Sequence, residues 1–245
     1  MKINKIYNED CLETMKRMED NSVNCIITSP PYNKGYWSKN RNINNGFKTK
    51  SRCIDYGNFN DNLKPNLYEN LQKKVIKECL RVLKPDGSMF YNHIDILNEH
   101  NTIHPNYIYD FPLKQIIIWN RKNTPKLDKS YFYPIHEYVF WLKKNKDSKP
   151  FFNRKNSTLN KSIWNITPAI NNNHPAPFPI KLVENCILMT TKKDDIIYDC
   201  YMGSGTTAKA AIKLNRKYIG SDLNLEYINK HILEEKNIMN QIKLF

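Results

Sequence analysis

The chain has 245 residues, of which 40% are hydrophobic, so it holds enough apolar material for one α/β domain and is not a disordered composition. Its formal net charge of +14 favours a polyanionic partner, although the abundance of Lys, Asn and Ile is also typical of composition bias. Residues 1–11 are polar and charged, and no apolar run approaches the roughly 20 residues that span a bilayer. We therefore expect a cytoplasmic protein without a signal peptide or membrane span.

The cysteines and histidines give no sign of a metal site. No pair among the six cysteines has the Cys-x-x-Cys spacing of a structural zinc site, and no set of His, Asp and Glu has metal-ligand spacing. We therefore expect no metal and a reducing compartment.

The first half of the chain begins with short alternating elements. Residues 2–7 can form a strand, residues 10–18 a helical turn or two, and the apolar run 23–28 a buried strand. The strand must end at Pro30 and Pro31, because two prolines cannot continue a central strand. The polar, basic residues 33–62 are predicted to form a long loop.

The middle of the chain predicts one long helix and further strands. Apolar residues recur with a helical period over 67–83. The remaining predictions are a turn at 85–87, strands at 88–92, 115–120 and 137–142, the last two paired at one edge, and a small inserted lobe at 145–173.

The last third returns to alternating helices and strands. Helices are predicted at 180–189, 205–214 and 225–238, and strands at 196–199 and 217–222. This alternation indicates an α/β protein with a doubly wound, mostly parallel sheet, in a single domain spanning 1–245.

A glycine-rich turn at 199–207 follows a predicted strand and opens a helix. Gly203 and Gly205 let the backbone turn tightly and approach a ligand, and Asp222 ends the next strand, where it can accept ribose hydroxyl protons. The pattern predicts a nucleoside-containing cofactor, either a dinucleotide or S-adenosylmethionine, although a ligand-free turn is the structural alternative. Asp199 favours S-adenosylmethionine, because an acid before the turn can pair with an α-amino group, which a pyrophosphate lacks.

The sequence Ser29-Pro30-Pro31-Tyr32 is suited to methylating an exocyclic amine. Such an amine is conjugated with its ring, and acceptors placed around its protons localise the nitrogen lone pair. Ser29 Oγ and the Pro30 carbonyl can be these acceptors, and Tyr32 can stack on a base that has been flipped out of the duplex. The alternative is that the motif is only a turn that ends a strand. The motif follows a buried strand, however, and the same chain holds a predicted nucleoside-binding turn, so catalysis is favoured.

With these motifs the chain resembles the permuted, β-class DNA amino-methyltransferases over nearly its whole length. The resemblance implies a Rossmann-like S-adenosylmethionine-dependent fold in which the catalytic motif precedes the cofactor motif. The catalytic residues it implies are Ser29, Pro30, Pro31 and Tyr32. The cofactor-binding residues it implies are Asp10, Cys11, Phe178, Pro179, Asp199, Tyr201, Gly203, Ser204, Gly205, Thr206 and Asp222. The family usually has Asp-Pro-Phe where this chain has Asp199-Cys200-Tyr201.

The resemblance also implies a double-stranded DNA substrate and a place in restriction-modification. We expect 33–62 to be a DNA-contacting loop and 145–173 a target-recognition insertion, while a solvated loop is the alternative for the former. The candidate DNA contacts are Lys34, Trp37, Lys39, Arg41, Arg52 and Arg121. A homodimer is plausible.

The base and the substrate class stay open on sequence grounds. In this family Ser-Pro-Pro-Tyr is more typical of cytosine-N4 enzymes and Asp-Pro-Pro-Tyr of adenine-N6 enzymes, so cytosine is favoured over adenine. An RNA or protein-factor methyltransferase and a catalytically silent DNA-binding subunit are two competing interpretations of the same motifs.

Overall fold

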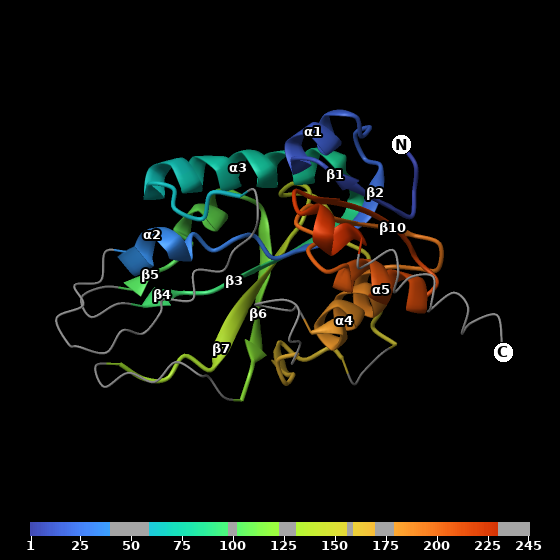
Figure 1. Ribbon diagram of the computed structural model, residues 1–245. Helices are drawn as coiled ribbons and strands as arrows, with labels where there is room; N and C mark the ends of the chain where they lie inside the picture. Colours follow the sequence, from blue (N-terminus) through green and yellow to red (C-terminus); the bar gives the residue numbers. More distant parts are fainter. Residues whose placement is uncertain (40–58, 98–101, 123–130, 156–158, 170–178, 230–245) are drawn as a thin grey trace.

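The structure is a computed structural model that describes residues 1–39, 59–97, 102–122, 131–155, 159–169 and 179–229, with the side chains of 37–39 left out (Figure 1). The strands are β1 (Lys5–Asn8), β2 (Val23–Thr28), β3 (Leu83–His93), β4 (Ile96–Leu97), β5 (Thr102–Ile103), β6 (Leu113–Asn120), β7 (His136–Leu142), β8 (Ile163–Asn165), β9 (Ile196–Asp199) and β10 (Lys217–Asp222). The helices are α1 (Cys11–Lys16), α2 (Lys34–Lys39), α3 (Pro65–Val82), α4 (Ile180–Thr190) and α5 (Thr206–Lys213), with a 3-10 turn η1 (Asn106–Asp110).

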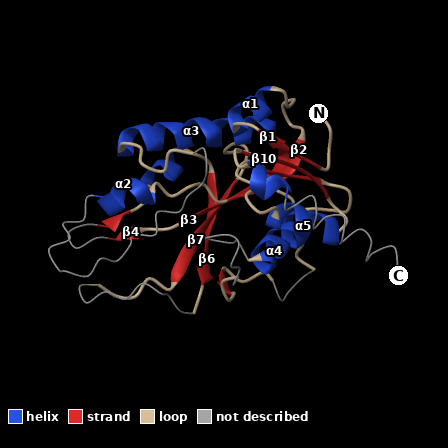
Figure 2. Ribbon diagram, in the orientation of Figure 1, coloured by secondary structure: helices blue, strands red, loops and turns tan. Residues whose placement is uncertain are grey.

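The main sheet has the strand order β1-β10-β9-β2-β3-β7-β6-β8. The strands from β1 to β3 pair in parallel, whereas β7 is antiparallel to both β3 and β6. Helices α1 and α3 lie on one face of this sheet and α4 and α5 on the other (Figures 1 and 2). The prediction of a doubly wound, mostly parallel sheet is therefore confirmed.

Strand β2 shows how the core is divided between the two faces. Cys25 and Ile27 belong to the core under α4 and α5, whereas Ile26 belongs to the core under α1 and α3. Successive strand residues point to opposite faces, so a strand that is buried on both sides needs a continuous apolar run. This is why the run at 23–28 predicts β2 with its observed bounds.

Strand β3 corrects the prediction of a separate turn at 85–87. The strand runs continuously from Leu83 to His93. Its register with β2 shifts between Val23↔Leu83 and Cys25↔Ser88, so the extra residues of β3 form a bulge within the strand. Gly87 is needed there, because a Cβ atom would lie 2.8 Å from the Asn24 carbonyl oxygen.

The segment 33–62 is not wholly a loop, since α2 forms directly after the Pro-Pro turn. Asn33 has a positive φ of 55° and joins the two ends of the segment: its Nδ2 donates to the Leu63 carbonyl and its Oδ1 accepts from the Leu63 amide, both at 2.8 Å. Residues 40–58 lie outside the described part of the chain.

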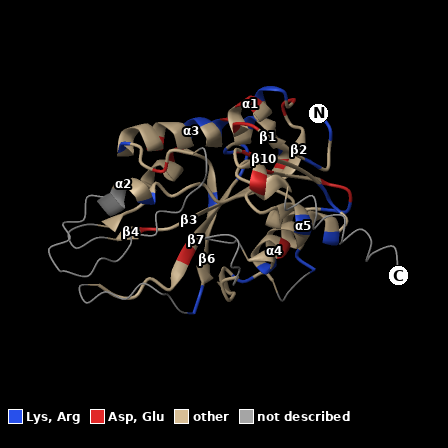
Figure 3. Cartoon of the chain, in the orientation of Figure 1, with Lys and Arg blue, Asp and Glu red and all other residues tan. Residues whose placement is uncertain are grey.

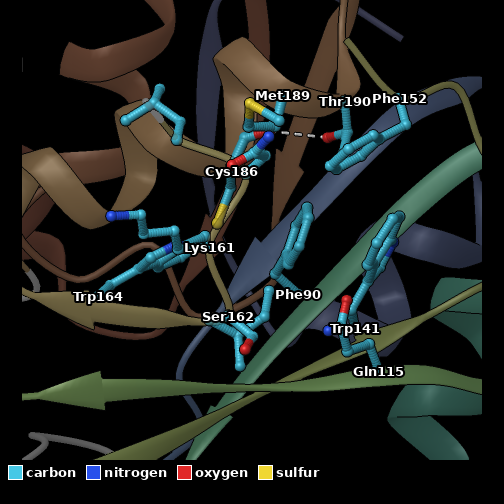
Figure 4. A pocket seen from close by; sticks show the side chains of 13 residues that line it. Phe90, Gln115, Trp141, Phe152, Lys161, Ser162, Trp164, Cys186, Met189 and Thr190 are labelled. Carbon is cyan, nitrogen blue, oxygen red and sulfur yellow. Dashed lines mark hydrogen bonds between the residues drawn. The ribbon is translucent and has the colours of Figure 1, made fainter. Parts of the chain in front are cut away.

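Described residues of 145–173 pack against the main sheet. Strand β8 pairs in parallel with β6, Trp164 is buried, and Phe152 stacks on Trp141 with ring centroids 5.5 Å apart. The aromatic residues of this segment pack on the sheet because burying large apolar rings removes much of their surface from water. A small pocket of about 30 Å³ remains between this segment, β3, β6, β7 and α4 (Figure 4).

Three further predictions concern local features. Residues 225–229 begin the closing helix predicted at 225–238, and the rest of that prediction lies outside the described residues. No helix in the described ranges is long and apolar enough to cross a membrane. Within the same ranges no three His, Cys, Asp or Glu side chains are grouped to hold a metal ion, and five cysteines are buried free thiols.

Candidate active site

The candidate site lies where the direction of chain winding reverses. From β2 the chain crosses through α3 to β3, whereas from β9 it crosses through α5 on the opposite face to β10, although β2 and β9 are neighbours. In open α/β sheets, ligands bind at the carboxyl ends of the strands at such a switch point. The sequence motifs at 28–32 and 199–207 follow these two strand ends, so folding brings them together.

Thr28 and Asp199 join the two motifs directly. Thr28 Oγ1 donates to Asp199 Oδ1 at 2.8 Å, and both side chains are buried. The same carboxyl group accepts from Thr207 Oγ1 at 2.6 Å and from the Tyr201 amide at 3.1 Å. Burial raises the pKa of Asp199 to about 6, although these hydrogen bonds oppose the shift. Asp199 therefore organises the glycine turn and the end of β2.

The glycine turn has the backbone geometry that glycine permits. Gly203 and Gly205 have positive φ angles of 53° and 79°, and Gly205 precedes α5 as its N-cap. Asp222 accepts from the Gly203 amide at 2.7 Å through Oδ2 and from the Asn224 amide at 2.8 Å through Oδ1. Burial raises the pKa of Asp222. The ends of β9 and β10 are thereby held in one arrangement around the turn.

The other predicted cofactor residues lie at the start of α1, at the start of α4, on the glycine turn and outside the described residues. Asp10 is exposed and caps α1 by accepting from the Leu12 amide at 2.8 Å, and Cys11 behind it is a buried thiol whose pKa is raised by its hydrogen bond with Cys200 and by burial. Pro179 is the buried N-cap of α4. Tyr201, Ser204 and Thr206 are half-buried on the turn and the first residue of α5, and Phe178 lies outside the described residues.

The Ser-Pro-Pro-Tyr loop is held by hydrogen bonds on both sides. Tyr68 of α3 donates its hydroxyl proton to the Pro31 carbonyl at 2.7 Å. The Tyr32 hydroxyl lies 2.8 Å from Ser29 Oγ, and Ser29 is half-buried. The Tyr32 ring is 6% exposed and lies against His93 at a centroid distance of 4.9 Å, with Lys34 Nζ 5.1 Å from its centroid. The predicted stacking of a base on Tyr32 therefore needs these neighbours to move.

Sequence reasoning missed two polar residues beside this loop. Asn92 Nδ2 donates to the Tyr32 hydroxyl at 2.6 Å and to Glu137 Oε2 at 2.7 Å. Asn92 is 1% exposed and Glu137 is 7% exposed. One signal was available: Glu137 is the only acid in the otherwise apolar and aromatic strand β7, where an acid needs partners to be buried.

The predicted DNA contacts fall into two groups. Lys34 is half-buried, and burial lowers its pKa, while Arg121 donates to Glu137 Oε1 at 2.8 Å and lies over the Trp119 ring. The backbone of Trp37 and Lys39 lies in α2, and Arg41 and Arg52 lie outside the described residues. In Figure 3 the Lys and Arg segments are spread over the described chain. The roles of these residues in DNA binding stay predictions.

A doubly wound sheet with Ser-Pro-Pro-Tyr after β2 and a glycine turn after the neighbouring β9 defines an α/β methyltransferase of permuted motif order. The chain belongs to the N6/N4 DNA methylase family, whose model matches residues 23–235. This membership confirms the prediction of an S-adenosylmethionine-dependent DNA methyltransferase acting on amino groups.

Individual proteins are similar to this chain in sequence or in fold. The Type II methyltransferase M.BglII of Bacillus subtilis is 29% identical over 93% of this chain and 67% of its own length. The fold is similar to that of the PvuII DNA methyltransferase (cytosine-N4-specific), with a TM-score of 0.71, 22% identity and coverage of 93% of this chain and 84% of that one. It is also similar to TTHA0409 of Thermus thermophilus complexed with S-adenosyl-L-methionine, with a TM-score of 0.68, 20% identity and coverage of 93% and 90%.

Proposed function

We propose that the chain transfers a methyl group from S-adenosylmethionine to the N4 amino group of a cytosine flipped out of double-stranded DNA. The observation that carries this proposal is the position of Ser29. Its hydroxyl lies 2.8 Å from that of Tyr32, and the preceding residue, Thr28, is hydrogen-bonded to Asp199 of the glycine turn. Ser29, the proposed acceptor for an amine proton, is therefore adjacent in sequence to Thr28, which contacts the predicted cofactor loop.

The residues at the strand ends fit S-adenosylmethionine. Asp199 Oδ2 accepts from Thr207 alone among the described residues, so this carboxylate oxygen retains acceptor capacity for an ammonium group. Asp222 lies at the end of β10, the position from which ribose binding was predicted. Asp10 is exposed and follows β1, the strand that pairs with β10. When bound, the cofactor supplies a methyl group on a positively charged sulfur. We assign its binding to Asp10, Cys11, Pro179, Asp199, Tyr201, Gly203, Ser204, Gly205, Thr206 and Asp222, and to Phe178 outside the described residues.

The Ser-Pro-Pro-Tyr loop performs the part of the reaction that the protein controls. Ser29 Oγ accepts one proton of the target amine, and the Pro30 carbonyl is available for the other because proline brings no competing amide donor. These contacts draw the nitrogen lone pair out of conjugation with the ring. With S-adenosylmethionine bound, this lone pair would take the methyl group, the sulfur would leave as a neutral thioether, and the surplus amine proton would pass to solvent. Tyr68 keeps the loop in place through Pro31, so most of the catalytic effect is alignment.

The choice of cytosine rests on Ser29, since aspartate at this position is more typical of adenine-N6 enzymes. The PvuII DNA methyltransferase, whose fold is similar, is cytosine-N4-specific, which supports the same choice. The test is to methylate DNA with the purified chain, digest it to nucleosides and identify the product by mass. We expect N4-methylcytosine. N6-methyladenine would overturn the base while keeping the enzyme class.

The same assay separates the remaining candidate classes. We expect radiolabel from the cofactor to enter DNA and not RNA or protein offered side by side. A chain that binds DNA and S-adenosylmethionine but labels none of the three would be a catalytically silent subunit, contrary to the proposal.

We propose that DNA approaches over the segment 33–62, which begins directly after Tyr32. The Gly35 amide donates to Asp61 Oδ2 at 3.1 Å, so both ends of this segment are fixed beside the catalytic loop. The exchange of Lys39 and Arg41 for Ala should weaken DNA binding and reduce its salt dependence. An unchanged salt slope would exclude these two residues as phosphate ligands. We further propose that residues 145–173 recognise the target sequence. We also propose that the protein is located with the DNA inside the cell and that it forms a homodimer.

A further inference from the structure

We propose that Glu137 is a positioning residue for methyl transfer, which acts through Asn92 and Tyr32 to keep both lone pairs of Ser29 Oγ free for the target amine. This inference rests on the proposed function of Ser29 as the amine acceptor. It concerns a residue at the start of β7, a strand that the catalytic and cofactor motifs do not include.

The strand pairing explains why Glu137 lies at the site. β7 is antiparallel to β3, so its first residues lie beside the carboxyl end of β3, with Asn92 opposite Val139 and His93 opposite Tyr138. The carboxyl end of β3 in turn lies beside that of β2. Side chains from three strands therefore meet at the catalytic loop, and Figure 3 shows the acidic segment of β7 toward one end of that strand.

The carboxylate determines how the Asn92 amide is oriented. Asn92 Nδ2 lies 2.7 Å from Glu137 Oε2, where the opposite orientation would place two acceptor oxygens against each other. The observed orientation leaves Asn92 Oδ1 buried without a hydrogen-bond partner among the described residues. An unpaired buried oxygen is unfavourable, so the need of the carboxylate for a donor decides the orientation. Asn92 consequently presents its NH₂ group to the Tyr32 hydroxyl, at 2.6 Å.

The count of donors and acceptors then determines the direction of the bond between Tyr32 and Ser29. A phenol hydroxyl has one proton and two lone pairs. One lone pair of Tyr32 is used by Asn92, and the Tyr32 proton is directed to Glu137 Oε2, which lies 3.5 Å away and carries the negative charge. With the Tyr32 proton directed to Glu137, the 2.8 Å bond between Ser29 and Tyr32, whose geometry suits either direction, runs from Ser29 to Tyr32. Ser29 donates its proton to Tyr32, and both of its lone pairs remain for the amine.

Arg121 holds the carboxylate in place. Its NH1 atom lies 2.8 Å from Glu137 Oε1, the oxygen that does not contact Asn92. Oε1 of Glu137 thus contacts the guanidinium, and Oε2 contacts the Asn92–Tyr32 pair. This gives a buried carboxylate the partners that it needs.

The test compares single-turnover methylation rates of the wild type, Glu137→Gln, Tyr32→Phe and the double variant. A charge-assisted hydrogen bond is about twice as strong as a neutral one, so we expect Glu137→Gln to be about 10-fold slower. Tyr32→Phe should be slower by a similar factor, because it removes the hydroxyl that connects Glu137 to Ser29. The double variant should be no slower than Tyr32→Phe, because both changes interrupt one path. KM for DNA and for S-adenosylmethionine should stay within about twofold of the wild type.

Glu184→Gln is the matched control. Like Glu137, Glu184 is 7% exposed and pairs with a cation, here Lys213 at 2.7 Å. It lies on α4 and is not one of the proposed site residues. We expect this variant to keep the wild-type rate.

Several outcomes would contradict the inference. The inference would be overturned by a Glu137→Gln rate equal to that of Glu184→Gln, or by additive losses in the double variant. A full rate in Tyr32→Phe would also overturn it, even if Glu137→Gln failed to fold. A loss of cofactor affinity and thermal stability in place of kcat would assign Glu137 a structural role. A wild type that methylates no base would instead contradict the proposed function.

Discussion

The titration of Asp199 gives a prediction in which cofactor binding and protein stability respond to pH in opposite directions. Asp199 is buried, and its pKa is raised to about 6 from an ordinary value of 3.8. If its ionised form pairs with the ammonium group of S-adenosylmethionine, lowering the pH from 7 to 5 should weaken binding. At pH 5 about one tenth of the groups is ionised, so the loss of affinity should be about 10-fold.

The stability of the ligand-free protein should change the other way. Because the pKa of Asp199 is higher in the folded state, the folded chain holds this proton more tightly than the unfolded chain does. The resulting stabilisation is complete below about pH 4 and is lost as the pH rises through about 6. A difference of about two pKa units corresponds to roughly 3 kcal/mol in the free energy of unfolding.

Calorimetric titration with S-adenosylmethionine at pH 5, 6 and 7, together with denaturant unfolding at the same pH values, tests both effects. The control is Asp199→Asn, which should bind weakly at every pH and lose this contribution to the pH dependence of unfolding. The pKa of Asp222 is also raised by burial, so the difference between the wild type and Asp199→Asn isolates Asp199. Wild-type affinity that is equal at pH 5 and 7 would refute the pairing of Asp199 with the cofactor.

Three further substitutions test separate parts of the site and the fold. Ser29→Ala should reduce the methylation rate roughly 100-fold with unchanged affinity for DNA and cofactor, and a rate near that of the wild type would remove Ser29 from catalysis. Tyr68→Phe loses the 2.7 Å bond to the Pro31 carbonyl, so we expect an unfolding free energy lower by about 1 kcal/mol and a rate reduced about 10-fold, whereas equal effects on rate and cofactor affinity would contradict a local role. Ile187→Ala removes a fully buried side chain of α4 and should cost about 2–5 kcal/mol of stability, measured by denaturant unfolding, while the KM values of the folded enzyme stay unchanged.

The main elements could be predicted because each is specified by a local pattern. The bounds of β2 follow from an apolar run that ends before two prolines. Those of β9 follow from the glycine turn that comes after it, and those of β10 from a run that ends at Asp222. The alternation of such strands with helices of apolar period led to the doubly wound sheet, and the order of the two motifs led to the family.

The expectation of a separate turn at 85–87 was wrong because the local pattern there is ambiguous. Pro85 and Gly87 are turn-forming residues, yet pairing with β2 keeps them within β3 as a bulge. The insertion predicted at 145–173 stays a prediction, and its sequence did not reveal that β8 pairs with β6 or that Phe152 stacks on Trp141.

The sequence by itself determined that a Ser-Pro-Pro-Tyr loop and a glycine turn follow two buried strands. Only the tertiary structure decided that those strands are neighbours, with Thr28 and Asp199 joined at 2.8 Å. It also brought Glu137 to the Ser-Pro-Pro-Tyr loop, because β7 runs antiparallel to β3 and its first residues lie beside the carboxyl end of β3. The physical reason is that strand pairing joins residues far apart in the chain, and no local pattern of side chains records which strands will pair.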